Sequence, residues 1–264
     1  MHFLGSVLCL LLKVDYLRNL KFYTLSNRVV IIPTYNEKEN IEKMIRKVFS
    51  LEEYFELLIV DDNSPDGTGE IVKCLQKEFT GLHLLSRQGK EGLGKAYLAG
   101  FQWALDHQYE YIFEMDCDFS HNPDDLIKLY KACTEGADLV IGSRYVTGVN
   151  VVNWPMSRVM LSFFGSVYVR FISRMKIHDA TAGFKCYHRK VLSSIDFDKI
   201  RFKGYGFQIE MKYISWKMGF KLKEVPIIFT DRTEGTSKIS KNIVAEALFG
   251  VIRLKFSSIK RYRK

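Results

Sequence analysis

The sequence is poor in the residue types that mark unusual classes of protein. Its 264 residues include only five prolines and eighteen glycines, so the composition is neither collagen-like nor that of a flexible linker. The five cysteines are scattered and form no C-x-x-C pair, which argues against both a zinc cage and a disulfide framework. Isolated cysteines of this kind are typical of free thiols in a reducing compartment.

Long apolar runs are also lacking. The longest one near the start, from Phe3 to Leu12, ends at Lys13 and is shorter than the roughly 20 residues that a membrane-spanning helix needs. It has neither the basic stretch nor the small-residue cleavage site of a secretory signal. We therefore expect no transmembrane helix. Residues 1–27 are interpreted as an extension that either lies on a surface or precedes the native start.

The sequence does contain the balance of a globular domain, with a basic excess. Hydrophobic residues make up 47% and charged residues 26% of the chain. The 39 basic and 30 acidic residues give a net charge of +9, which favours anionic partners such as phosphates, nucleic acids or acidic membranes. The basic excess lies at the C-terminus instead of being interleaved with aromatic residues over one face, so we expect no nucleic-acid binding.

Strand and helix patterns alternate over roughly the first 145 residues. Short apolar runs predict buried strands, and apolar residues spaced three and four apart predict the intervening helices. This alternation predicts an α/β fold, a doubly wound and mostly parallel sheet with helices on both faces. The predicted strands cover residues 29–32, 57–60, 82–85, 111–115, 138–142 and 221–229, and the clearest helices cover 41–49, 92–107, 156–173 and 206–218.

Polar residues follow several of these strands, where ligands bind in such sheets. Asp116, Asp118 and Ser120 come after the strand at 111–115, and an extended backbone would point all three side chains the same way. Two carboxylates and a hydroxyl would then form the hard-oxygen site that Mg²⁺ or Mn²⁺ prefers. The alternative is a solvated acidic turn. Asp61 and Asp62 are similarly either turn-capping residues or acceptors for a base or ribose.

The familiar phosphate-binding motifs of dehydrogenases and P-loop enzymes do not occur in the sequence. A different ordered set does: Pro33-Thr34-Tyr35-Asn36-Glu37, Val60-Asp61-Asp62-Asn63-Ser64, Gly92-Leu93-Gly94, Met115-Asp116-Cys117-Asp118 and Gly142-Ser143-Arg144-Tyr145. This set resembles the family-2 inverting glycosyltransferases of the GT-A fold, and within them the dolichol-phosphate (polyprenol-phosphate) mannosyltransferases. The resemblance extends from about Arg28 to Lys241.

The resemblance implies a donor-binding role for several positions. The residues matched to the nucleotide's base and ribose are Pro33, Tyr35, Glu37 and Asp62. Asp116 and Asp118 match ligands of the divalent metal, Mg²⁺ or Mn²⁺, and of the donor diphosphate; Cys117 between them replaces a common Ala. Ser120 stands at a third ligand position where some relatives have Gln. Arg232 and Lys238 match a loop that closes on the diphosphate.

The acceptor side is implied in the same way. Arg144, Arg158 and Ser162 match residues that meet the acceptor phosphate, and Arg144 is also placed at the donor. With Asp118, these three are the predicted catalytic residues. The segments 179–185 and 204–210 match the family as well, so Asp179 and Gln208 either contact substrate or belong to turns and packing.

The function that the resemblance implies is transfer of mannose from GDP-mannose to a polyprenyl (dolichyl-type) monophosphate with inversion. Transfer of glucose or an amino sugar to the same lipid is an alternative, as is a non-enzymatic module that binds a nucleotide or a membrane. Because polyprenyl substrates reside in bilayers, we expect a cytoplasmic protein, peripheral on the cytoplasmic face of a membrane. The motifs specify no protein partner.

The C-terminal segment has a character of its own. Residues 241–264 contain seven basic residues and one acidic residue, and apolar residues recur at helical spacing from Ile243 to Phe256. A basic amphipathic helix is typical of membrane surfaces, although a docking helix with a solvated basic tail fits the pattern nearly as well. The expected organisation is an extension at 1–27, a glycosyltransferase domain at 28–240 and this helix at 241–264.

Overall fold

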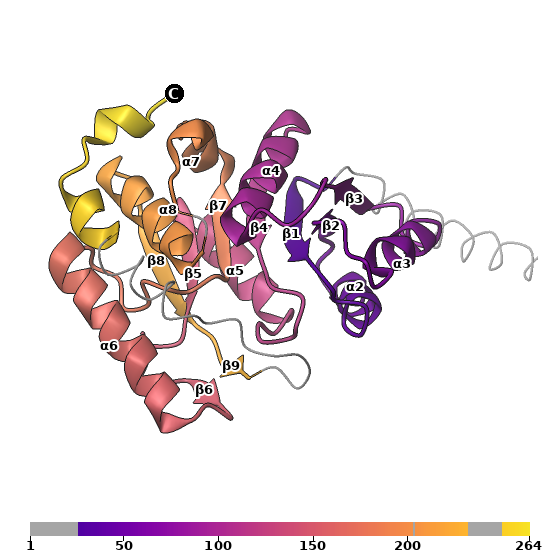
Figure 1. Cartoon of the computed structure of the whole chain (residues 1–264), viewed down its shortest axis with the longest axis horizontal. Coiled ribbons are helices and arrows are strands. Elements are labelled where there is room, and N and C mark those ends of the chain that lie inside the picture. The colour runs from indigo at the N-terminus through magenta and orange to yellow at the C-terminus, as the bar shows by residue number, and fades with distance from the viewer. Residues whose placement is uncertain (1–25, 203, 232–249) are drawn as a thin grey trace, which may run out of the picture.

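A seven-stranded sheet runs through the centre of the protein (Figure 1). The computed structural model describes residues 26–202, 204–231 and 250–264. The strand order is β3-β2-β1-β4-β7-β5-β8. The bounds of these strands are β1 Arg28–Thr34, β2 Glu56–Asp61, β3 Leu82–Ser86, β4 Tyr111–Glu114, β5 Leu139–Ser143, β7 Lys185–His188 and β8 Leu222–Pro226. A second, two-stranded sheet pairs β6 (Val151–Val152) with β9 (Phe229–Thr230).

All neighbouring strands of the large sheet run parallel except at β7, which pairs antiparallel with both β4 and β5. The carboxyl ends of β1, β2 and β4 therefore meet at one edge, together with that of β5. This is the mostly parallel sheet that the alternating pattern predicts, and that prediction is confirmed. The strand expected at 221–229 is divided into β8 and β9, while β6 and β7 were not expected.

Helices cover both faces of the sheet. The bounds are α2 Ile41–Phe49, α3 Thr68–Leu75, α4 Leu93–Asp106, α5 Asp125–Thr134, α6 Met156–Ser173, α7 Arg189–Ser193 and α8 Tyr205–Lys217, with two short 3₁₀ helices at Phe197–Lys199 and Ile259–Tyr262. Before α5, the Asn122 side chain accepts a hydrogen bond from the Asp124 amide at 3.1 Å. This bond lies in the turn that leads into α5, whose N-cap residue is Asp124.

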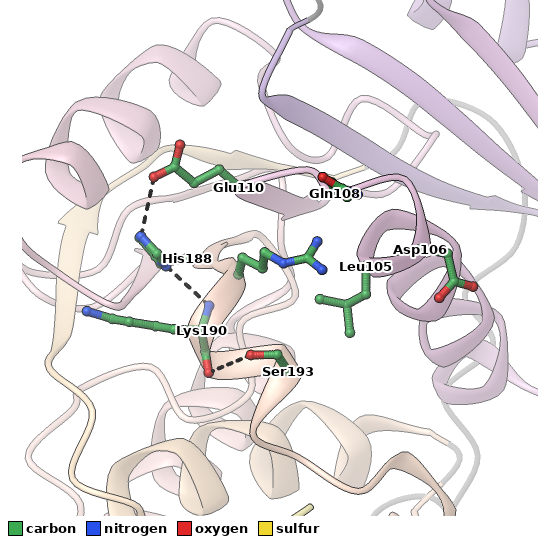
Figure 2. Close-up of a pocket in the computed structure, with 8 residues that line it drawn as sticks. Leu105, Asp106, Gln108, Glu110, His188, Lys190 and Ser193 are labelled. Atoms are coloured by element: carbon green, nitrogen blue, oxygen red, sulfur yellow. Dashed lines mark hydrogen bonds and ion pairs between the residues drawn. The ribbon is translucent and has the colours of Figure 1, made fainter.

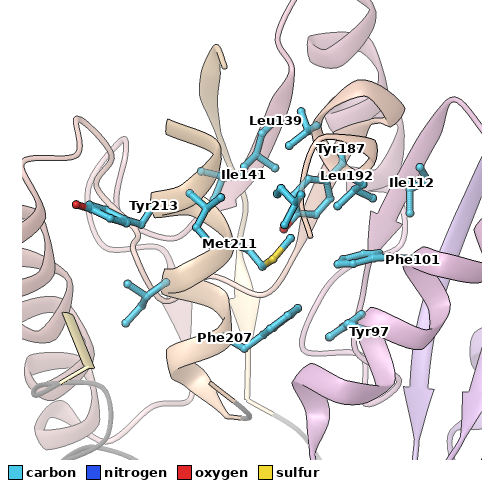
Figure 3. Packing of buried hydrophobic residues seen from close by; sticks show 14 of the residues in the cluster. Tyr97, Phe101, Ile112, Leu139, Ile141, Tyr187, Leu192, Phe207, Met211 and Tyr213 are labelled. Atoms are coloured by element: carbon cyan, nitrogen blue, oxygen red, sulfur yellow. The ribbon is translucent and has the colours of Figure 1, made fainter. Parts of the chain in front are cut away.

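The apolar strands bury side chains on both faces, because successive side chains of a strand point in opposite directions. Val29 and Ile31 of β1 pack with α4, α7 and α8, whereas Val30 and Ile32 pack with α2, α3 and α5. Figure 3 shows the first of these two layers, in which the rings of Tyr97 and Phe207 stack with centroids 6.1 Å apart. Complete burial on both faces explains why these strands are continuous apolar runs.

The described part of the C-terminus packs against the same layer. Residues 250–255 are helical, and Val251 and Leu254 are buried in the core. Tyr262 is buried as well and donates a hydrogen bond to Glu210 at 3.3 Å. The described residues therefore show the docking arrangement that was the second interpretation of this segment. The remainder of the predicted helix, 241–249, lies outside the described residues, so the membrane interpretation stays a prediction.

Candidate active site

The loops that follow β1 and β2 are tied together at the carboxyl edge of the sheet. Asp61 accepts hydrogen bonds from the hydroxyls of Thr34 at 2.9 Å and Ser64 at 2.6 Å. The Asp62 amide donates to the Thr34 carbonyl at 3.0 Å. Asp61 therefore has the turn-capping role, and these bonds place Asp62 beside the end of β1.

Asp62 pairs with an arginine that the sequence analysis did not single out. Arg87 comes directly after β3, and its Nη1 lies 2.5 Å from Asp62 Oδ1. Arg87 also contacts Glu91 at 3.3 Å. Burial raises the pKa of Asp62 above its ordinary value, although Arg87 acts in the opposite direction. A single basic residue after a strand is ordinarily exposed, so no local pattern distinguishes Arg87 among the 39 basic residues.

The other residues matched to the nucleotide lie at the end of β1 and on the loop after it. Pro33, Tyr35 and Glu37 are half-buried. The Glu37 amide donates to the Thr68 hydroxyl at 3.0 Å, which fixes this loop against the start of α3. Lys90, a second basic residue absent from the prediction, holds its Nζ 4.3 Å from the centre of the Tyr35 ring. The ends of the first three strands thus bring acidic, aromatic and basic side chains to one edge.

Asp116 and Asp118 follow β4 in the middle of that edge. The Tyr97 hydroxyl lies 3.3 Å from Asp116 Oδ1, and the Asp116 amide donates to Nδ1 of the buried His121 at 3.2 Å. The Asp116 side chain keeps 39% of its surface exposed. Its desolvation and the neighbouring Asp118 carboxylate raise the pKa of Asp116. Two carboxylates that oppose one another's ionisation are a natural place for a divalent cation.

The geometric argument for Ser120 is wrong. The backbone turns at Phe119, whose φ of 59° is left-handed, so Asp116, Asp118 and Ser120 do not lie along one extended strand. Ser120 is buried, and its amide donates to Asp118 Oδ1 at 3.1 Å. Cys117 is also buried, and its side chain belongs to the core on the α2, α3 and α5 face. Asp116 and Asp118 stay the predicted carboxylate ligands, and the described ranges contain no cluster of three or more His, Cys, Asp or Glu side chains suited to a metal.

Arg144 follows β5 and is held by Asp179. The guanidinium donates to both carboxylate oxygens of Asp179, at 2.7 and 2.6 Å, and to the Thr181 hydroxyl at 2.7 Å. Asp179 is fully buried, yet Arg144 and Lys212 outweigh the cost of burial and hold its pKa below the ordinary value. Asp179, one of the two residues left open between substrate contact and packing, therefore positions Arg144.

The segment around Asp179 is itself fastened from two sides. Glu224 of β8 accepts hydrogen bonds from the amides of His178 at 2.7 Å and Asp179 at 2.8 Å. The ammonium of Lys212, fully buried in α8, donates to the backbone carbonyls of Ala180 and Ala182 at 2.8 and 2.7 Å. These contacts give the Arg144 guanidinium a rigid support.

A buried polar cluster lies just before Asp116, at the end of β4. Lys185 of β7 contacts Glu114 at 2.9 Å and donates to the Tyr187 hydroxyl at 2.8 Å. Gln208 donates to Glu114 at 2.9 Å and accepts from Lys185. Both charged groups are fully buried, and each therefore needs the other. Gln208, the second residue left open, is part of this internal network.

Arg158 and Ser162 lie on α6. Arg158 Nη1 contacts both carboxylate oxygens of Asp231, at 2.8 and 2.9 Å, and its guanidinium lies 4.1 Å from the centre of the Trp154 ring. Arg144 lies over the same indole at 5.5 Å, so Trp154 links the two arginines. Ser162 is half-buried on the same helix. The other two cations of the predicted site, Arg232 and Lys238, lie outside the described residues.

An open hollow of about 730 Å³ lies elsewhere, at the opposite edge of the sheet (Figure 2). Glu110 and His188 are among its lining residues and lie 3.6 Å apart. Glu110 precedes β4, whereas the aspartates follow it, so the hollow and the predicted site are at opposite ends of this strand. No residue of the predicted site lines this hollow.

Comparisons with known proteins agree with the arrangement of this edge. Residues 29–196 match the family described as glycosyl transferase family 2. The chain is 46% identical over 224 residues to a polyprenol monophosphomannose synthase of Mycolicibacterium smegmatis, covering 84% of each chain. It is 44% identical over 225 residues to an undecaprenyl-phosphate mannosyltransferase of Micrococcus luteus, covering 85% of this chain and 92% of the relative.

A solved structure shares the fold. It is a glucosyl-3-phosphoglycerate synthase from Mycobacterium tuberculosis in complex with Mn²⁺, uridine-diphosphate-glucose and phosphoglyceric acid, with a TM-score of 0.64. The match covers 86% of this chain and 79% of that one at 17% identity. At this identity the likeness concerns the fold alone, and it confirms the expected GT-A architecture.

Proposed function

The chain belongs to glycosyl transferase family 2, and from that premise we propose that it transfers mannose from GDP-mannose to a polyprenyl monophosphate. The products are polyprenyl phosphate mannose, with inverted configuration at the sugar C1, and GDP. The observation that carries the proposal is the single edge of the sheet at which Asp62, the Asp116–Asp118 pair and Arg144 follow the parallel strands β2, β4 and β5. Two mannosyltransferase relatives with 46% and 44% identity support the choice of sugar and acceptor.

On the donor side, the nucleotide would lie over the ends of β1 and β2. Pro33, Tyr35, Glu37 and Asp62 would hold its base and ribose, with Arg87 and Lys90 adding positive charge beside them. Arg144, Arg232 and Lys238 would face the diphosphate. Cationic side chains stabilise the negative charge that grows on a departing diphosphate, which is the demanding part of glycosyl transfer.

The residues present fit a divalent metal. Asp116 and Asp118 are close enough for one to raise the pKa of the other, and Asp116 is partly exposed. In many Mg²⁺ or Mn²⁺ sites the protein supplies one or two carboxylates, and substrate phosphates and water supply the remaining ligands. When bound, the metal would neutralise charge on the diphosphate leaving group.

On the acceptor side, Arg144, Arg158 and Ser162 would receive the phosphate monoester. Arg158 holds the Asp231 carboxylate in this structure, an anion of the kind that a phosphate could replace. The phosphate needs no strong base, because its second pKa is about 6 and it is largely dianionic at neutral pH. One of its oxygens attacks C1 of the mannose as the bond from C1 to the diphosphate oxygen breaks. The bonding electrons leave with GDP.

The acceptor also sets where the protein works. A polyprenyl phosphate is held in a bilayer by its chain, so the enzyme would act as a peripheral protein on the cytoplasmic face of a membrane. No helix among the residues that the structure describes is long and apolar enough to cross a membrane.

An assay with purified protein tests the proposal. It would supply Mg²⁺ or Mn²⁺, a short polyprenyl phosphate and, in turn, GDP-mannose, UDP-glucose and a UDP-amino sugar. We expect a mannolipid from GDP-mannose alone. Transfer from one of the other donors, or no transfer from any, would overturn the assignment.

A further inference from the structure

Helix α6 exposes large apolar side chains and buries small, mostly polar ones, which is the reverse of the usual arrangement in a surface helix. The residues that it buries are Ser166, Val169 and Ser173, two of which are polar. Its large apolar side chains are exposed instead, and Phe171 and Met156 retain 80% and 71% of their surface. The set of exposed large apolar residues on α6 is Met156, Met160, Leu161, Phe163, Phe164 and Phe171.

These side chains form one continuous stripe. On a helix with 3.6 residues per turn, all of them except Leu161 fall within an arc of about 100°, and the buried residues lie roughly opposite. The two charged residues of α6 are Arg158 and Arg170, and neither falls within that arc. A continuous, solvent-facing apolar stripe without charged residues is uncommon on a soluble protein and indicates a contact surface.

We propose that this stripe of α6 lies in the interface of an anionic lipid bilayer. The inference rests on the proposed function, because it explains how the enzyme would reach an acceptor that is held in a membrane. An amphipathic helix of this kind lies in the plane of the membrane with its apolar face among the lipid chains.

The position of the stripe favours a bilayer as its partner. Arg158 and Ser162, the residues proposed to meet the acceptor phosphate, lie on the same helix but on its inner side. The phosphate would thus be bound next to the interface in which its polyprenyl chain is embedded. Figure 1 shows α6 along the outer edge of the molecule, away from α2 and α3.

Charge favours an anionic surface over a second copy of the chain. Residues 156–176 contain four basic residues and no acidic one, and residues 250–264 contain six basic residues and no acidic one. Two such surfaces would repel each other, whereas each basic residue near an anionic bilayer contributes about 1 kcal/mol of attraction.

The test is flotation of the full chain with phosphatidylcholine vesicles, with and without phosphatidylglycerol. The unmodified protein should float with the anionic vesicles, and less so at high salt. The double variant Phe164→Glu/Phe171→Glu should bind at least roughly tenfold more weakly, because it removes two rings from the lipid and adds two carboxylates. Phe256→Glu changes an equally exposed phenylalanine outside α6; it is the matched control for the single variant Phe171→Glu and should weaken binding less than that variant does.

The other outcomes overturn the proposal. If Phe256→Glu loses binding and the α6 variant keeps it, the C-terminal segment is the membrane contact. If the unmodified chain ignores vesicles, the proposal also fails; a dimer that the α6 variant converts to a monomer would then assign the stripe to a second copy. Thermal unfolding of each variant shows that it is folded.

A parallel assay separates this inference from the proposed function. In detergent, with a short polyprenyl phosphate, the α6 variant should transfer mannose at the unmodified rate, while on vesicles its rate should fall with its binding. If no chain transfers mannose in detergent, the proposed function fails and the flotation result stands by itself.

Discussion

Arg144 and Asp179 form a buried ion pair with two hydrogen bonds, from Nε to Oδ2 at 2.7 Å and from Nη2 to Oδ1 at 2.6 Å. The Arg144 amide also donates to Asp179 Oδ2, at 3.0 Å. The carboxylate thus fixes both the backbone and the guanidinium of a residue proposed to meet substrate phosphates. Such a group is positioned before the substrate arrives, which is what electrostatic stabilisation requires.

Asp179→Asn should destabilise the protein by about 3–5 kcal/mol, because it leaves the Arg144 charge buried without its partner. The exposed Asp198→Asn is the matched control and should change stability by less than about 0.5 kcal/mol. Urea unfolding at neutral pH measures both. Equal stability of the two variants would show that Arg144 finds another partner.

The same pair predicts a pH dependence of stability. The folded pKa of Asp179 lies below its ordinary value of 3.8, so its contribution is fully present above about pH 4 and is lost as the pH falls through the lower, folded pKa. The free energy of unfolding of the unmodified chain should therefore decline more steeply than that of Asp179→Asn on acidification below pH 4. Parallel declines would contradict this.

The strands that could be predicted from the sequence are the ones buried on both faces. In β1 and β2 every face meets a helix layer, so the sequence shows an unbroken apolar run. Strand β7 was not predicted because it contains Lys185, whose burial depends on Glu114, 71 residues earlier in the chain. Such long-range neutralisation leaves no local pattern.

The candidate site was predictable to a similar degree. The family motifs located the strand ends, and the structure brings Asp62, Asp116 and Arg144 to one edge of the sheet. The hydrogen-bonded supports of that edge, Arg87 and Lys212, could not be found, because each is a single basic residue whose partner lies far away in sequence. Ser120 was misplaced because a left-handed residue, Phe119, cannot be recognised from an apparently extended run.

Arg158→Lys should raise the KM for the acceptor while binding of GDP-mannose changes little. Lysine cannot present the planar fork that an arginine can offer to a phosphate, whereas Arg158 contacts both Asp231 oxygens here through Nη1. Arg170→Lys, in the same helix, is the matched control. Steady-state kinetics with each substrate varied in turn measure the effect. An equal rise of the KM for donor and acceptor would contradict the assignment of Arg158 to the acceptor.

Gly94→Ala should destabilise the protein by about 1–3 kcal/mol, the usual cost of overpacking. A Cβ at this position would lie 2.9 Å from the Phe202 carbonyl oxygen and 3.0 Å from the Phe207 ring. Gly165→Ala on α6 is the control, because a Cβ there meets no atom within 4 Å and alanine favours a helix. Thermal unfolding should therefore show a lower Tm for the first variant and an equal or higher Tm for the second.

Asp118→Asn should reduce mannose transfer by roughly a hundredfold or more, because it keeps the shape of the side chain and removes one negative charge from the proposed metal site. Chelation by EDTA should reduce the activity of the unmodified chain similarly, and added Mg²⁺ or Mn²⁺ should restore it. Asp106→Asn, on the exposed end of α4 far from the carboxyl edge, should leave activity unchanged. Full activity of Asp118→Asn together with resistance to EDTA would remove the metal-bridged diphosphate from the proposed reaction. Asp116 and Asp118 would then be assigned to binding of the sugar or the ribose instead of a metal.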